Sequence, residues 1–150
     1  MQMLVQAQAG SGDRRLYDER KLEYRNTRHG TKPYPYPYGF IVGTADAQGE
    51  CVDCYLITRD PVEAGALVEC EPLALLEQDE GGEIDHKVLA ALPGQEVEVS
   101  EALVKELREF IYALFAEHPE VRVRVGPLHP PDEALRYIQE HRRYWAEGEP

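Results

Sequence analysis

The sequence predicts a small β-barrel flanked by two helices that lie toward the C-terminal end. Two observations support this prediction. The first hundred residues alternate short strand-like stretches with turns rich in Gly, Pro and Asp. After Ser100 the apolar residues instead recur at helical spacing. Many short strands followed by helices favour a barrel that the helices cover on its outside.

The strand-like stretches of the first half are bounded by turn residues, and the prolines of the segment 34–38 favour an extended backbone without ladder donors. The segment 16–24 has mixed character and is expected to hold two short strands. An acidic, Gly-rich turn is expected over 78–85. The remaining strands are expected at 3–9, 38–44, 51–58, 66–76 with an interruption at Pro72, 87–92 and 96–99.

Helical periodicity extends over 101–117, where Ser100 is the expected N-cap and Pro119 ends the helix. Residues 121–125 alternate as a half-buried strand does. A second helix is expected from Pro131, with Leu135, Ile138 and Trp145 on one side. Such apolar stripes are typical of core or subunit contacts.

Length and charge limit the classes of function. The 150 residues suit one domain, expected over 1–150, and the net charge of −12 argues against nonspecific nucleic-acid binding. No apolar run approaches the roughly 20 residues of a membrane span, and the N-terminal residues do not resemble a secretory signal. We therefore expect a cytoplasmic protein without membrane contact. Cys51 and Cys54 form a C-x-x-C spacing, but no second ligand pair for zinc follows, so a structural or incidental role is expected for both and for Cys70.

Three clusters could carry chemistry. In the first, Tyr34 and Tyr38 lie among alternate prolines, which suits either hydroxyl donors for phosphate or a packed aromatic edge. In the second, Glu50 and Asp53 follow a Gly turn, and their carboxylates suit Mg²⁺. The third, 79–87, has four carboxylates, two glycines and a closing lysine. It is either a solvated acidic turn or a second group of metal ligands beside a phosphate-binding cation.

These clusters together resemble the family I soluble inorganic pyrophosphatases. The run from Tyr34 to Ile41, the segment Gln48-Gly49-Glu50-Cys51-Val52-Asp53 and the cluster 79–87 follow the order of that family's motifs. The corresponding family patterns are Asp-Gly-Asp-Pro-x-Asp and Asp-Glu-x-Gly-x-Asp-x-Lys, and the second is matched here with one extra residue near Ile84. The resemblance implies an OB-like five-stranded β-barrel with two C-terminal helices. It also implies Mg²⁺-dependent hydrolysis of pyrophosphate to two phosphates, with Mn²⁺ as a substitute, and a homo-oligomer, usually a hexamer.

Site residues are carried over position by position from this resemblance. Glu50 stands where the family has the aspartate that orients or deprotonates the attacking water. The implied substrate ligands are Arg25, Tyr34, Tyr38 and Lys87, and the implied metal ligands are Asp53, Asp79, Asp85 and Gln48.

Several positions depart from the family pattern. Gln48 replaces the first aspartate of the motif, and Glu50 is one methylene longer than the usual aspartate. Leu16 stands at the position expected for a phosphate-binding lysine, for which Arg14 or Arg15 is a substitute. Glu120 follows Pro119 where the family has Tyr-Lys. These departures favour weakened or altered hydrolysis. The alternatives are a non-catalytic homologue that binds a phosphorylated ligand or acts as an assembly subunit, and a different hydrolase that uses fewer metals.

Overall fold

The computed structural model describes residues 1–143, within which ten strands and two helices follow one another. The mainly β fold with two C-terminal helices is confirmed, while the expected position of Trp145 lies outside the described residues. The elements are β1 (Gln2–Ala7), β2 (Arg14–Asp18), β3 (Glu23–Arg28), β4 (Tyr38–Ile41), β5 (Asp53–Leu56), β6 (Leu67–Glu69), β7 (Glu71–Glu80), β8 (Glu83–Ile84), β9 (Lys87–Ala91), α1 (Glu101–Phe115), β10 (Val123–His129) and α2 (Pro131–Glu140).

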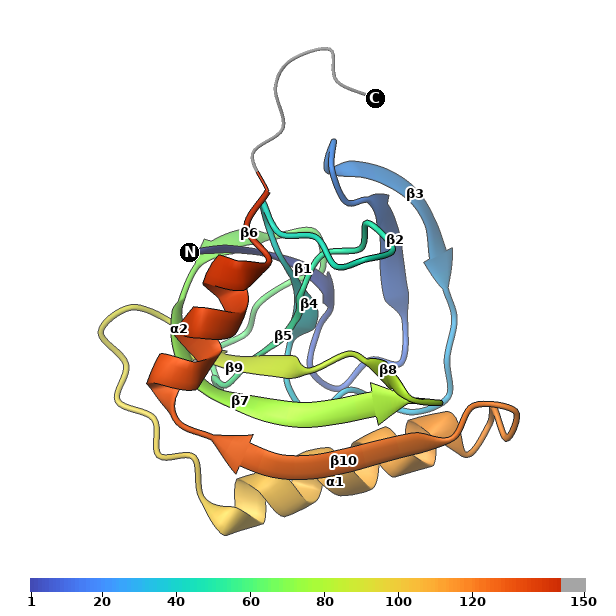
Figure 1. Cartoon of the computed structure of the whole chain (residues 1–150). Coiled ribbons are helices and arrows are strands. Elements are labelled where there is room, and N and C mark those ends of the chain that lie inside the picture. The colour runs from blue at the N-terminus through green and yellow to red at the C-terminus, as the bar shows by residue number, and fades with distance from the viewer. Residues whose placement is uncertain (144–150) are drawn as a thin grey trace.

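The sheet curls into the barrel that the resemblance implies (Figure 1). Its strand order is β10-β7-β9-β5-β4-β1-β6, and β5 pairs with β9 in parallel while the other neighbours along this path are antiparallel. Strand β6 pairs with β1, and Cys70 alone separates β6 from β7. The segment 67–80 therefore runs from one edge of the sheet to the other side and closes the barrel.

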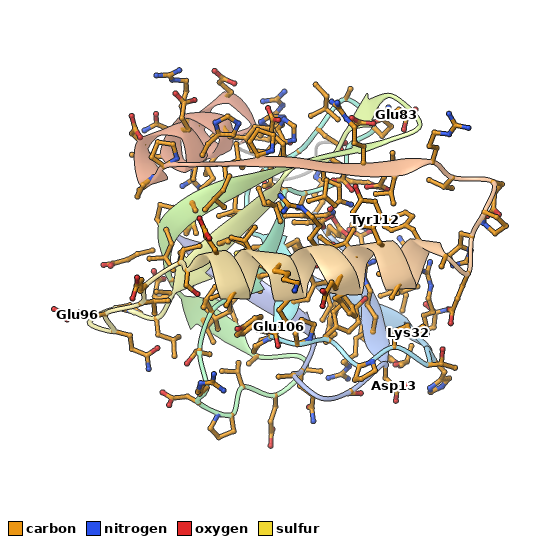
Figure 2. The ribbon with its side chains drawn as sticks, turned by 90° about the horizontal axis from the view of Figure 1, so that it is seen from below. Asp13, Lys32, Glu83, Glu96, Glu106 and Tyr112 are labelled. Carbon is orange, nitrogen blue, oxygen red and sulfur yellow. The ribbon has the colours of Figure 1, made fainter. Side chains whose placement is uncertain are left out.

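The two helices cover different sides of the barrel, and the β2–β3 hairpin stands away from both (Figure 1). Helix α1 buries Val104, Leu107 and Ile111 in the core, as its helical periodicity predicts. Figure 2 shows Tyr112 between α1 and β10, where its hydroxyl accepts a hydrogen bond from Val125 N at 3.0 Å. No helix within residues 1–143 combines the length and apolarity needed to cross a membrane.

Ser100 caps helix α1, as predicted, and its hydroxyl accepts a hydrogen bond from Leu103 N at 3.2 Å. Ser100→Ala is expected to lower the free energy of unfolding by about 1 kcal/mol, because an N-terminal N–H of the helix loses its partner. Urea unfolding followed by circular dichroism measures this change. Ser100→Asp retains an acceptor and should stay near the parent stability; equal losses in both variants would contradict the capping role.

Three expectations about the strands and turns are wrong. The break expected at Pro72 lies instead at Cys70, and Pro72 is part of β7. The segment 96–99 forms no strand in the structure: Val97 and Val99 pack on the core from an extended loop while the glutamates face solvent. Its alternation therefore reflects one buried side rather than strand pairing. The acidic turn expected over 78–85 is shorter, because β7 continues to Glu80 and pairs with β8.

Candidate active site

A cavity of about 660 Å³ opens between the β2–β3 hairpin, one end of the barrel and the C-terminal half of α1. Its walls are strongly charged, with more acidic than basic side chains. The acidic ones are Glu19, Glu50, Asp53, Glu80, Asp85, Glu117 and Glu120, and the basic ones are Arg14, Arg28, Lys32 and Lys87.

Lys87 is at the centre of the acidic part of the cavity. Its Nζ donates to Asp53 Oδ2 at 2.5 Å and to Asp85 Oδ2 at 2.8 Å. Asp53 and Lys87 are direct partners in the parallel β5–β9 pair, so their side chains emerge on the same face. Asp85 precedes Lys87 by two residues and faces the same way. The fold thus brings together three residues that the resemblance singled out.

The two predicted tyrosines also line the cavity. Tyr34 and Tyr38 stack with ring centroids 5.3 Å apart, and both are buried. The Tyr38 hydroxyl accepts a hydrogen bond from Lys87 Nζ at 3.3 Å, and the Arg14 guanidinium lies 5.2 Å from the Tyr38 ring centre. The two tyrosines therefore form a packed aromatic wall of the cavity, and the Tyr38 hydroxyl contacts Lys87.

Asp79, an expected metal ligand, does not lie with Asp53 and Asp85. Its carboxylate instead pairs with Arg124 at 3.2 Å on the outer face, because successive side chains of β7 point to opposite faces. Glu80 faces the cavity in its place. In the family motif the second aspartate follows the first by five positions. Five positions before Asp85 is Glu80, so the extra residue near Ile84 moves the first metal-ligand position from Asp79 to Glu80.

Gln48 and Arg25 also lie away from the cavity lining. Asp46 Oδ1 accepts the N–H groups of Gln48 and Glu50, and this turn leaves Gln48 exposed. Arg25 is exposed and pairs with Asp18 at 2.9 Å. Glu50, the expected base, does line the cavity.

The sequence patterns do not point to Glu19 or to the buried Gln78, and they indicate Arg14 only as one of two substitutes for a lysine. Arg14 and Leu16 line the cavity from the same face of β2, whereas Arg15 points away and donates to Ala64 O at 3.2 Å. Side chains alternate between the two faces of a strand, so a strand that includes residues 14–16 places Arg14 on the same face as Leu16 and would have indicated Arg14 rather than Arg15. Glu19 lies in a turn, where no periodicity places a side chain.

The electrostatic environment separates the carboxyl groups. Burial, aided by the nearby Asp53, raises the pKa of Glu19 to about 7. Burial and a hydrogen bond with Asp85 raise the pKa of Glu80 to about 8. Burial opposes ionisation of Asp85 as well, but Lys87 and the Glu80 hydrogen bond outweigh it and lower the pKa of Asp85 to about 2. Glu50 is largely exposed, and its partial burial together with the neighbouring Asp46 and Asp53 raises its pKa.

Lys87 and Arg14 stay charged in the cavity. Burial disfavours the Lys87 ammonium, but Asp53 and Asp85 outweigh that effect and hold the pKa of Lys87 well above its ordinary value. The pKa of Arg14 is likewise raised against burial, by Tyr38 and Asp53. These cations neutralise only part of the acidic lining.

The donor set fits a divalent cation in chemistry and charge. As placed, no three Asp, Glu, His or Cys side chains within residues 1–143 are close enough to hold a metal ion, since Lys87 Nζ lies between Asp53 and Asp85. The cavity nevertheless offers only oxygen ligands on its acidic side, which Mg²⁺ and Mn²⁺ prefer. It also contains a buried Gln78 Oε1 without a hydrogen-bond partner among the described residues.

A second hollow, of about 720 Å³, is slightly larger and lies over Tyr36, Arg59 and Gln95. Its carboxylates, Asp60, Glu96, Glu98 and Glu106, surround the exposed Arg59, and its lining contains no buried cation like Lys87 of the first cavity. Glu96 and Glu106, both on its rim, are visible in Figure 2. The chemistry therefore favours the smaller cavity as the functional site.

Comparison with known proteins identifies the family. The family described as inorganic pyrophosphatase matches residues 15–146. The chain therefore belongs to the inorganic pyrophosphatase family, in its soluble family I branch, as the motifs predicted.

Individual relatives are more distant. An inorganic pyrophosphatase of Aeropyrum pernix is 34% identical over 117 residues, covering 71% of this chain and 66% of the relative. One of Nanoarchaeum equitans is 27% identical over 105 residues, covering 70% of this chain and 65% of the relative. The matching part of the chain thus spans just under two thirds of the length of both relatives.

Solved structures share the fold. The inorganic pyrophosphatase of Neisseria gonorrhoeae superposes with a TM-score of 0.84 at 19% identity, covering 94% of this chain and 88% of that chain. The enzyme of Thermus thermophilus superposes with a TM-score of 0.81 at 23% identity, covering 93% of this chain and 87% of that chain. These similarities support the barrel and its two helices.

Proposed function

We propose that this protein is a divalent-metal-dependent inorganic pyrophosphatase, which hydrolyses pyrophosphate to two phosphates. The observation that carries the proposal is the contact of Lys87 with Asp53, Asp85 and Tyr38 inside one acidic cavity. The basic side chains of such a site can bind an anion, and the excess negative charge of its carboxylates can be balanced by a bound cation. A metal-bound pyrophosphate satisfies both requirements.

Each side chain then has a defined task. Asp53, Asp85 and Glu80 would hold Mg²⁺ or Mn²⁺, with Glu80 in the place expected for Asp79. When bound, the metal would neutralise phosphate oxygens and lower the pKa of a water molecule. Lys87 and Arg14 would bind phosphate oxygens, and Lys87 must then turn from its carboxylate partners toward the substrate.

The remaining groups orient the reactants. The hydroxyls of Tyr34 and Tyr38 donate to phosphate oxygens, and Tyr38 already lies within hydrogen-bond distance of Lys87. Glu50 would accept a proton from the attacking water, and burial together with Asp46 raises its pKa, which makes it a stronger base. Its extra methylene favours slower hydrolysis than an aspartate would give. Assembly into a homo-oligomer and a cytoplasmic location remain predictions.

Lys87 also favours a second candidate function. Its Nζ takes up the space between Asp53 and Asp85, which is what a non-catalytic homologue that binds a phosphorylated ligand would show. In such a protein the lysine would replace the metal permanently.

Phosphate release from pyrophosphate, measured across Mg²⁺ and Mn²⁺ concentrations, separates the two candidates. We expect metal-dependent release that EDTA abolishes and that Asp53→Asn lowers by roughly a hundredfold or more. Folded protein that binds pyrophosphate in calorimetry but releases no phosphate at any metal concentration would establish the non-catalytic function instead.

A further inference from the structure

Glu19 connects the β2–β3 turn to the segment that identifies the family. Its Oε1 accepts a hydrogen bond from Cys51 N at 2.8 Å, and the Cys51 thiol lies 3.8 Å from the carbonyl oxygen of Glu19. The side chain lines the cavity beside Glu50 and Asp53. The hairpin thereby places a carboxylate against the motif whose first aspartate is replaced by Gln48.

One oxygen of this carboxylate has no partner within residues 1–143. Oε1 binds Cys51 N, while Oε2 accepts no hydrogen bond and forms no ion pair with the described residues. Among the charges that act on this carboxylate, Asp53 and Glu50 repel it and Arg14 attracts it. Since Arg14 also interacts with Asp53, it does not balance Glu19 by itself.

A buried amide gives independent support for a bound cation. Gln78 is 1% exposed and lines the same cavity, and its Nε2 donates to Glu80 Oε2 at 3.2 Å. Its Oε1 has no hydrogen-bond partner within the described residues. Buried acceptors are normally satisfied, so this oxygen is available to a cation or to a water molecule in the cavity.

We propose that Glu19 supplies, from the β2–β3 turn, the carboxylate that Gln48 no longer provides to the divalent-cation site, with Gln78 Oε1 facing the same cation or its water. This inference rests on the cation site of the proposed function. On this proposal, the negative charge that is absent at Gln48 is supplied by Glu19 from another part of the chain.

The hydrogen bond to Cys51 does not by itself require a charged residue. A glutamine has the same length and an acceptor oxygen, and it would avoid a charge beside Glu50 and Asp53. A carboxylate kept close to two like charges is costly unless a cation balances it. The charge and the hydrogen bond of Glu19 can therefore be tested separately.

The test compares Mn²⁺ affinity in Glu19→Gln and Glu23→Gln, using calorimetry on the 150-residue chain without substrate. Glu23 belongs to the same hairpin but is exposed on β3, so its variant controls for the loss of one charge. We expect Mn²⁺ affinity to fall at least about tenfold in Glu19→Gln and to stay near the parent value in Glu23→Gln. The melting temperature of Glu19→Gln in EDTA should not fall.

Glu19→Asp and Glu19→Ala complete the series. The aspartate retains the charge but is too short to keep the Cys51 hydrogen bond, so it should bind Mn²⁺ more tightly than Glu19→Gln; the reverse order would show that only the hydrogen bond matters. Loss of stability in Glu19→Ala alone, with parent-like Mn²⁺ affinity in Glu19→Gln, would also overturn the proposal. So would a parent chain that binds no Mn²⁺.

Phosphate release is measured separately on the same proteins. A parent that binds Mn²⁺ through Glu19 yet hydrolyses nothing would refute the pyrophosphatase function and leave this inference standing. A parent that hydrolyses pyrophosphate while Glu19→Gln binds Mn²⁺ normally would refute the inference alone.

Discussion

Glu80→Gln is expected to lower Mg²⁺-dependent phosphate release from pyrophosphate by roughly a hundredfold or more. The neighbouring Asp79→Asn is expected to leave it within about a factor of two, since exposed ion pairs contribute at most about 1 kcal/mol. Both variants neutralise one carboxylate, and the two positions are adjacent on β7. They differ in the face of the strand on which the side chain lies.

The physical reason is the alternation along β7. Gln78 and Glu80 line the cavity, whereas Glu77 pairs with His129 and Asp79 pairs with Arg124 on the outer face. Removing the Glu80 carboxylate would withdraw a proposed metal ligand that contacts Asp85. Removing the Asp79 carboxylate breaks only a partly exposed pair.

Initial rates at several Mg²⁺ concentrations measure both effects. Recovery of Glu80→Gln at high Mg²⁺ would place the defect in metal binding, and a persistent loss would place it in the chemical step. Unfolding in urea is the control for stability. A large loss in Asp79→Asn together with normal rates in Glu80→Gln would restore the assignment made from the sequence motif.

Local patterns predicted most of the elements of the fold. Helix α1 begins after Ser100, where an N-cap precedes apolar residues at helical spacing, and the structure confirms the cap. The strand expected at 96–99 is wrong, because alternation of Glu and Val reports one buried side but not a hydrogen-bonded neighbour. The pattern of buried and exposed residues can be read from neighbouring residues in the sequence. Hydrogen bonding to another strand depends on segments that are distant in the sequence.

The residues of the candidate site also differ in whether the sequence alone could predict their positions. Asp53 and Lys87 were both selected by motif, but only the parallel register of β5 and β9 places them side by side. Asp79 and Glu80 are neighbours on β7 and point to opposite faces of the strand. The extra residue in the following turn shifts the motif by one position, so the motif alone selects the residue on the wrong face. Glu19 lies in a turn, so its approach to Cys51 depends on how the hairpin folds against the barrel. Tertiary structure decides each of these cases.

Lys87→Met is expected to lower the free energy of unfolding in EDTA by about 3 kcal/mol, near the lower end of the range for breaking a buried ion pair. The Lys87 side chain is 5% exposed, and its ammonium bonds to Asp53 and Asp85, whose side chains are 15% and 34% exposed. Methionine fills similar volume but leaves both carboxylates without their cation. Urea unfolding at pH 7 measures the loss, and Lys105→Met, in an exposed pair with Glu109, is the matched control.

The stability loss of Lys87→Met should depend on pH and on the Mg²⁺ concentration. Because Lys87 helps to lower the pKa of Asp85 to about 2, the stability gained from that pair is present above the unfolded pKa of Asp85 and lost as the pH falls toward 2. The difference from the parent should therefore shrink in acid. Saturating Mg²⁺ should also shrink it at pH 7, because a cation at Asp53 and Asp85 would replace the missing ammonium. A deficit that Mg²⁺ leaves unchanged would show that these carboxylates serve Lys87 rather than a metal.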